Sequence, residues 1–328
     1  MRPVDLSWRT LAPSDASAMA EVSAAAAEAD RLPALRESAA EFAESFHGAG
    51  RAVAPLALGA FAHDGRLAAF GTLTVRTAAD LVHLLPFDGM VHPGFRRQGV
   101  GTELLRRAVA AAPALHLRAF PQAPLELLVH MVDDVPGQPE AAAAAGFTPW
   151  RSSLDMARDL PENPETLAVP APRGLELLGF AQEYVEPLHA VHNAAFVPDH
   201  PGSTAPTAQM WAARFTAGSF RPELSFLLRD TATGRIAGYL LGNEHPQDPA
   251  TKAREAHLTT IAVLRAHRGR GAASALIGAA LAAAVREGYG IATLDVDAQN
   301  PTGAVRVYER AGFRTVRRAT AHVRKIVA

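Results

Sequence analysis

Apolar runs along the chain alternate with segments of helical period, and turn-forming residues separate the two. In the second half, this pattern predicts strands over 175–178, 224–229, 236–243, 256–263, 291–296 and 319–326. It predicts helices over 183–196, 209–215, 274–287 and 304–311. Central hairpins combined with strand–helix–strand order indicate an α/β fold with a mixed sheet.

The same order of elements occurs twice. The segments 91–101 and 263–273 both contain Val-x-x-x-x-Arg-x-x-Gly, and their matching residues lie 172 positions apart. A glycine between strand-like runs recurs at Gly65 and Gly234, as hairpin turns require. Because these landmarks keep one order and nearly one offset, we expect a duplicated unit rather than chance similarity.

Two further features mark the ends of the repeated units. A Gly-Phe pair closes each half, at Gly146 and Gly312. Prolines are frequent between the halves, which indicates a linker. The predicted domains are therefore 1–158 and 173–328, joined by a proline-rich linker over 159–172.

Composition narrows the class of protein. The chain has 328 residues, a formal net charge of −1 and no cysteine, which excludes disulfides, thiolate metal sites and a cysteine nucleophile. The near-neutral charge gives no support for nucleic-acid binding. The most apolar stretch, 272–285, is too short to span a bilayer, and the start lacks the apolar core of a secretory signal. We expect a cytoplasmic monomer or homodimer without nucleic-acid or membrane partners.

The turn at 268–273, Arg-Gly-Arg-Gly-Ala-Ala, joins an apolar strand to an apolar helix. Glycines allow a sharp turn, and a helix N-terminus offers free N–H groups and partial positive charge, so the turn suits phosphate oxygens. Arg265, Arg268 and Arg270 would add mobile positive charge, and an ordinary helix start with solvated arginines is the alternative. Neither a P-loop nor a Rossmann fingerprint fits these residues.

The pattern Val-x-x-x-x-Arg-x-x-Gly-x-Gly/Ala after a strand resembles the acetyl-CoA-binding segment of the GNAT N-acetyltransferase superfamily. Asn300, Tyr308 and the Gly312-Phe313 pair resemble the family's later segment in order and spacing. The resemblance covers 172–328 well and 1–158 less well. It implies two tandem GNAT folds, each a mixed, mostly antiparallel β-sheet flanked by helices. Two such domains in one chain also resemble the architecture of the mycothiol synthase family of actinobacteria.

The resemblance implies acetyl-CoA (coenzyme A) as cofactor. Backbone amides of the turn would hold its pyrophosphate, strand 257–263 would pair with the pantetheine arm, and Asn300 would hydrogen-bond that arm. The residues so implied in the second half are Ile261, Val263, Arg268, Gly269, Arg270, Gly271, Ala272, Ala273 and Asn300. Their counterparts in the first half are Arg96, Gly99 and Gly101.

Acetyl transfer to an amine needs a base for the amine, a polarised carbonyl and an acid for the departing thiolate. The resemblance implies Tyr308 as the acid; a packed helix aromatic is the structural alternative. Many GNAT enzymes carry a glutamate six residues before the valine of the phosphate turn, where this chain has His257, with Glu255 two residues earlier on the same strand face. His257 as base and His257 as a polar strand-end residue both stay open. Glu244 is the reserve base.

The first half lacks parts of this set. Counted back from Gly146, the position of the tyrosine holds Ala142 and that of the asparagine holds Asp134. We therefore expect the first domain to be degenerate and non-catalytic, and either to bind CoA without the acid or only to support its partner.

Several polar residues remain without an assigned chemistry. His189 and His192 lie one helical turn apart, but no carboxylate pattern accompanies them, so we expect a solvated helix face and no metal. Asp295 and Asp297 share a strand face and would meet a cationic substrate or, more simply, arginines. The acceptor site would be built from 183–215, the loop at 243–246 and the final strands.

These features predict an N-acetyltransferase that moves acetyl from acetyl-CoA to a primary amine of a small molecule or peptide. The amine would attack directly in a ternary complex in the second domain. A non-catalytic CoA-binding or scaffold protein is the alternative from another class, and a mycothiol-precursor acetyltransferase is the alternative within enzymes. The fold alone does not decide among acceptors.

Overall fold

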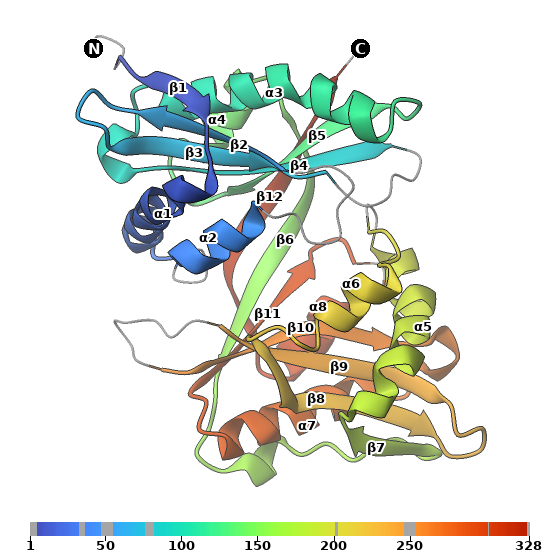
Figure 1. Cartoon of the computed structure of the whole chain (residues 1–328). Coiled ribbons are helices and arrows are strands. Elements are labelled where there is room, and N and C mark those ends of the chain that lie inside the picture. Colours follow the sequence, from blue (N-terminus) through green and yellow to red (C-terminus); the bar gives the residue numbers. More distant parts are fainter. Residues whose placement is uncertain are drawn as a thin grey trace. The chain divides into compact units, whose positions relative to one another are not determined.

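The computed structural model describes residues 5–32, 37–46, 55–75, 82–200, 203–245, 253–300 and 302–326. These residues form two compact units (Figure 1). The first unit comprises Met1–Ser152 together with Ala319–Ala328, and the second comprises Ser153–Arg318. Each unit is a β-sheet covered by helices, as the sequence predicts (Figure 1).

In the first unit, the strand order is β1-β2-β3-β4-β5-β12, and only the pair of β4 and β5 is parallel among the pairs described. Its strands are β1 (Ser7–Thr10), β2 (Leu56–Phe61), β3 (Leu67–Leu73), β4 (His83–Val91), β5 (Leu125–Val132) and the later part of β12 (Arg314–Ile326). Its helices are α1 (Ala16–Asp30), α2 (Ala39–Ser45), α3 (Val100–Ala119) and α4 (Gln138–Ala144).

The second unit repeats this plan with the order β6-β11-β10-β9-β8-β7, and β10 and β11 form its parallel pair. Its strands are β7 (Leu175–Gly179), β8 (Phe220–Asp230), β9 (Ile236–His245), β10 (Glu255–Val263), β11 (Ile291–Asp297) and the later part of β6 (Thr148–Asp159). Its helices are α5 (Val185–Ala195), α6 (Ala208–Ala213), α7 (Ala272–Arg286) and α8 (Ala304–Arg310). The prediction of a mixed, mostly antiparallel sheet in each half is confirmed.

The last strand of each half completes the other unit's sheet. Residues 153–159 of β6 pair with β11 in the second unit, and residues 319–326 of β12 pair with β5 in the first. The predicted domains, 1–158 and 173–328, each keep their last strand and so do not include this exchange of strands. An apolar pattern identifies a strand, but it does not say which neighbour the strand pairs with.

The segment predicted as a linker, 159–172, packs into the second unit. Pro164–Leu167 form a short 3-10 helix, and the buried Leu167 belongs to the same apolar cluster as Leu276 and Ile277 of α7. The side chains Leu154 and Met156 from β6 join this cluster. The second unit's core therefore contains side chains that precede the predicted domain.

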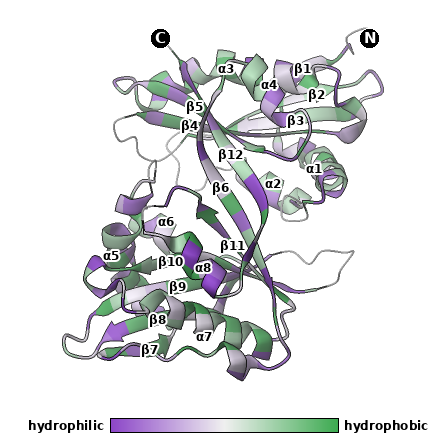
Figure 2. Ribbon diagram, turned by 180° about the vertical axis from the view of Figure 1, so that it is seen from behind, coloured by the Kyte–Doolittle hydropathy of each residue, from purple (hydrophilic) through white to green (hydrophobic). Residues whose placement is uncertain are grey.

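In the second unit, hydropathy differs between the central strands and the short helix α8. Figure 2 shows hydrophobic colouring along much of β8, β9 and β10, whereas the short helix α8 carries hydrophilic residues. Among the helices described, none combines the length and the apolar character that a membrane crossing needs.

Candidate functional site

Strands β10 and β11 separate after a short parallel stretch. They pair only over 255–257 and 291–293, and β10 then continues to Val263. On its other side, the register with β9 shifts between Leu258 and Thr260, which places a bulge at Thr259. From 258 onward, the edge of β10 that faces β11 is open, so its backbone N–H and C=O groups are available to an extended ligand.

The predicted phosphate turn lies at the end of this open strand. Gly269 and Gly271 have φ of +71° and +89°, in the left-handed region that glycine tolerates, and Gly271 is the N-cap of α7. The first N–H groups of a helix have no partner within the helix, which applies to Ala272 and Ala273. The turn therefore presents backbone donors and the positive end of α7, as a phosphate site requires.

The side chain of Arg268 has a structural role that the sequence prediction did not contain. Its Nε donates to the carbonyl of Val263 at 2.7 Å, and an Nη lies 2.7 Å from the buried carboxylate of Asp199 and donates to Ala195 O at 3.1 Å. The expectation of mobile charge on Arg268 is therefore corrected: the guanidinium is fixed and holds the turn against α5. Arg270 donates to the carbonyl of Arg173, while Arg265 is largely exposed.

The first unit repeats this anchor. Arg96 donates to Val91 O and forms a bidentate ion pair with Asp30 at 2.6 and 2.8 Å. Asp30 and Asp199 are 169 positions apart, close to the 172 that separate the arginines. This pair of aspartates was missed by the sequence analysis, although the repeat offset was a signal that could have found it.

His257 and Glu255 are brought together by Thr293, which the sequence analysis also missed. Thr293 Oγ1 donates to Glu255 Oε1 at 2.7 Å and lies 3.0 Å from His257 Nδ1. Since Thr293 donates its one hydroxyl hydrogen to the carboxylate, its oxygen must accept a hydrogen bond from a protonated Nδ1 of His257. The arrangement therefore leaves Nε2 of His257 as the nitrogen with the free lone pair.

The pKa shifts agree with this proton arrangement. His257 is only 8% exposed, and this burial lowers its pKa. The neighbouring His245 lowers it further. Burial acts to raise the pKa of Glu255, but the hydrogen bonds from His245 and Thr293 outweigh it, and the net shift is downward. At neutral pH, Glu255 is thus an anion and His257 is a neutral imidazole.

His245, Glu255 and His257 also form the kind of donor set that binds divalent metals, with ligand atoms within 4.8 Å of one another. The two imidazole rings are stacked at 4.1 Å and nearly parallel, at 18°. Their lone pairs therefore do not converge on one point, and the Thr293 hydroxyl bridges Glu255 and His257. The geometry fits a hydrogen-bonded chain better than a metal centre.

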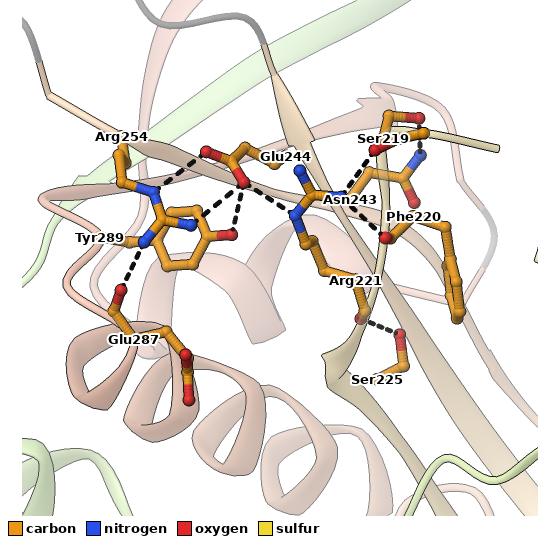
Figure 3. A network of polar contacts seen from close by, with 10 residues as sticks. Ser219, Phe220, Arg221, Ser225, Asn243, Glu244, Arg254, Glu287 and Tyr289 are labelled. Carbon is orange, nitrogen blue, oxygen red and sulfur yellow. Dashed lines mark hydrogen bonds and ion pairs between the residues drawn. The ribbon is translucent and has the colours of Figure 1, made fainter.

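Glu244, the reserve base, is held in a different network (Figure 3). Its carboxylate accepts hydrogen bonds from Arg254, Arg221 and the hydroxyl of Tyr289. The bonds from Arg254, then those from Arg221 and Tyr289, lower the pKa of Glu244 to about 2. A carboxylate so stabilised is a poor proton acceptor at neutral pH, so the reserve assignment is corrected to a structural one.

Tyr308 and Asn300 lie where the motif predicts, on α8 and in the turn before it. Tyr308 is buried in the apolar cluster under α7, and burial raises its pKa to about 12, which keeps the phenol protonated. Asn300 Oδ1 accepts from the backbone N–H of Thr302 at 2.9 Å. Its oxygen is thus used within the turn, and the NH₂ group is the part that can reach a ligand.

The first unit has leucines at the corresponding strand positions. In its parallel pair, Leu85 stands opposite Leu127, as His257 stands opposite Thr293. Both leucines are fully buried. The register of β3 with β4 shows no shift of the kind found in β10. With Ala142 in place of Tyr308, the first unit lacks, at the described positions, the histidine, the tyrosine and the bulge that the second unit has.

Two other predictions about polar residues have different outcomes. His192 is not on a solvated face: it is 2% exposed, and its Nδ1 lies 2.6 Å from the hydroxyl of Tyr239. Asp295 is mostly exposed, and its carboxylate lies 3.6 Å from His257 Nε2. Of the predicted acceptor segments, residues 201–202 and Pro246 lie outside the described residues.

The two units, each with a splayed parallel strand pair and a glycine turn opening a helix, define a class of protein. The sequence model of the Acetyltransferase (GNAT) family matches this chain twice, over residues 22–123 and 185–313. The chain therefore belongs to the GNAT family, and it is an N-acetyltransferase.

The relatives of the chain include several mycothiol acetyltransferases. That of Nocardia farcinica is 31% identical over 265 residues, which cover 80% of this chain and 78% of the relative. That of Parafrankia sp. is 29% identical over 94% of this chain and 95% of the relative. That of Propionibacterium freudenreichii is 29% identical over 69% of this chain and 66% of the relative.

Solved structures share the whole architecture. The GCN5-related N-acetyltransferase from Sphaerobacter thermophilus is 27% identical with a TM-score of 0.78, over 98% of this chain and 96% of that chain. A tandem GNAT protein from the clavulanic acid biosynthesis pathway has a TM-score of 0.72 at 20% identity, over 98% of both chains, and shows the fold alone. The tandem GNAT prediction is thereby confirmed.

Proposed function

We propose that the second unit transfers the acetyl group of acetyl-CoA to a primary amine by direct attack in a ternary complex. The observation that carries the proposal is the series of hydrogen bonds that links Glu255, Thr293 and His257 beside the open edge of β10. It sets a free imidazole nitrogen next to a backbone edge that ends in a phosphate turn. The first unit has leucines there.

The residues of the second unit fit acetyl-CoA as a co-substrate. The amides of 269–273 at the start of α7 would bind the pyrophosphate. Ile261 and Val263 lie on the open part of β10, whose backbone would pair with the pantetheine arm, and the NH₂ group of Asn300 would donate to that arm. Acetyl-CoA supplies the thioester carbonyl that the amine attacks, and the N–H groups at the Thr259 bulge would polarise it.

The proton transfers follow from the two titratable groups. His257 Nε2 accepts the proton that the amine loses as the N–C bond forms, directly or through water. Glu255 and Thr293 keep the proton of the imidazole on Nδ1 and stabilise the imidazolium that results. As the C–S bond breaks, the phenol of Tyr308 protonates the thiolate of CoA. Asp295, whose carboxylate lies 3.6 Å from Nε2, would further stabilise the imidazolium by its negative charge.

We propose that the acceptor is a small-molecule amine and, more specifically, the amine precursor of mycothiol. The support is the set of mycothiol acetyltransferases that align with most of this chain, at about 30% identity. His257 at the position where many family members have glutamate is the residue that bears most directly on whether the acceptor is the same.

A screen of amine acceptors by CoA release tests the proposal. The chain has no cysteine, so a thiol reagent detects CoA without background from the protein, and for acceptors that carry a thiol CoA is separated by chromatography before it is measured. Wild type should release CoA with at least one amine, and His257→Ala should lower kcat about 100-fold. Tight acetyl-CoA binding without release for every amine would favour the non-catalytic alternative. Unchanged kinetics in His257→Ala would remove this residue as base.

A further inference from the structure

Arg158 connects the strand exchange to the helix that carries Tyr308. It lies on the exchanged part of β6, where it pairs with Ala292 of β11. Its guanidinium donates to the carbonyl of Ala311, directly after α8. The same group lies against Gly312, where a Cβ would come within 3.1 Å of Arg158 Cζ. Gly312 has a φ of +83°, so this turn needs glycine for its backbone as well as for the space.

The turn that Arg158 contacts also fixes Tyr308. The N–H of Phe313 donates to the carbonyl of Tyr308 at 3.0 Å, which closes α8. The Phe313 ring packs edge-on against the Tyr308 ring, with centroids 6.3 Å apart. A displacement of the 311–313 turn would therefore move the backbone and the ring of Tyr308 together.

Placing the charged guanidinium of Arg158 at this position costs desolvation free energy. Burial lowers the pKa of Arg158, which shows that its charge is partly withdrawn from water. Its hydrogen bond goes to a neutral carbonyl at the negative end of a helix, which stabilises a cation modestly. A partly buried charge with a neutral partner adds little net stability, so the geometry that it imposes is the better explanation for this contact.

The first unit contains the same contact without the tyrosine. Arg324, on the exchanged part of β12, donates to the carbonyl of Ala145 and lies over Gly146. The residue at the position of Tyr308 is Ala142. The contact of Arg324 with Ala145 thus has the same chemistry as that of Arg158 with Ala311, but it lies in the unit that has no counterpart of Tyr308. Its loss is therefore a matched control.

We propose that Arg158 is a positioning residue for Tyr308, so that the first half of the chain contributes to proton donation in the second unit. This inference rests on the proposed function, in which Tyr308 is the acid. Arg158 acts through the 311–313 turn and does not touch substrate.

A double-mutant cycle tests it. Arg158→Met should lower kcat about 10-fold, with the KM for acetyl-CoA changed by less than about two-fold, because the pyrophosphate turn is untouched. In a Tyr308→Phe background, Arg158→Met should cause no further loss. Arg158→Lys, which keeps a cationic donor, should recover part of kcat. The matched variant Arg324→Met should leave kcat unchanged, and thermal melting of all variants reports whether they fold.

The outcomes separate the two claims. If Tyr308→Phe leaves kcat unchanged, the acid assignment itself fails. If Tyr308→Phe lowers kcat but the effect of Arg158→Met is absent, or simply multiplies with it, the positioning role is refuted while the acid stands. An equal loss in Arg324→Met would refute it too, because the effect would then be one of general stability.

Discussion

At the scale of single residues, Thr293 determines which nitrogen of His257 can act. Its hydroxyl proton is donated to Glu255, so its oxygen accepts a hydrogen bond from Nδ1–H of the imidazole, and the lone pair of Nε2 stays free. The carboxylate thus orients the imidazole of the proposed base through the Thr293 hydroxyl. A similar division between base and orienting carboxylate operates in hydrolase triads, where a misplaced imidazole proton lowers the rate strongly.

Removal of the Thr293 hydroxyl should therefore lower the rate without abolishing the base. We expect Thr293→Val to reduce kcat about 10-fold or more, whereas Thr293→Ser, which keeps the oxygen, should stay near wild type. In wild type, kcat/KM should fall with acid only below the ordinary histidine value of about 6.5, because the pKa of His257 is lowered and its neutral form is required. The measurement is kcat/KM against pH, and an acid limb well above that value that is not the titration of the acceptor's own amine would contradict the assignment.

At the scale of elements, the open edge of β10 and the start of α7 form one surface. The bulge at Thr259 and the early end of pairing with β11 expose the strand, and the glycine turn brings donors to its end. Arg268 holds this turn in place through Val263 and Asp199. The arginine of the motif is therefore explained by what it contacts within the protein.

Asp199→Asn should weaken acetyl-CoA binding, because it takes the charged partner from a largely buried guanidinium contact. We expect the KM for acetyl-CoA to rise about 10-fold, consistent with about 1.4 kcal/mol lost from the turn. Asp30→Asn makes the same change to the pair with Arg96 in the first unit, and it should leave that KM unchanged. Equal effects of the two variants in steady-state kinetics would show that the anchor serves stability alone.

The sequence locates those parts of the candidate site that are local in the chain. The phosphate turn, Asn300 and Tyr308 are set by short motifs, and the hairpins by their glycines. Thr293 could not be found in this way, because its place beside His257 depends on the pairing of two strands far apart in sequence. Nothing in the sequence indicates that Glu244 has ion-pair partners, and only the structure shows that Arg221 and Arg254 bind its carboxylate. The prediction that His192 lies on a solvated face was wrong, because the helical pattern around it does not reveal that Tyr239, far away in the sequence, is its buried hydrogen-bond partner.

At the scale of the whole molecule, two copies of one fold differ in chemistry and share strands. The first copy keeps the arginine anchor and the glycine turn but has Leu85 and Ala142 where the second has His257 and Tyr308. Each sheet is completed by the last strand of the other half. The halves are therefore unequal in their proposed sites, and each contributes a strand to the other's sheet.

The exchange predicts that neither half folds well alone. A fragment of 173–328 lacks residues 153–159, and with them Leu154 and Met156 of the second core. Loss of two large buried side chains costs about 2–5 kcal/mol each, a large part of the stability of a domain. We expect the fragments 1–172 and 173–328 to be unstable separately and to regain cooperative thermal unfolding and activity when co-expressed. Full activity of 173–328 alone would contradict the exchange.

The central claim, that acetyl transfer takes place in the second unit, is tested most directly by equal damage to the two phosphate turns. Gly271 and Gly99 are both helix N-caps with positive φ, at +89° and +80°. Valine strains both positions in the same way, since a β-branched residue does not tolerate this region. The measurement is kcat/KM for acetyl-CoA in Gly271→Val and in Gly99→Val. The account predicts a loss of about 100-fold or more for Gly271→Val and near wild-type values for Gly99→Val, and the reverse pattern would place the chemistry in the first unit.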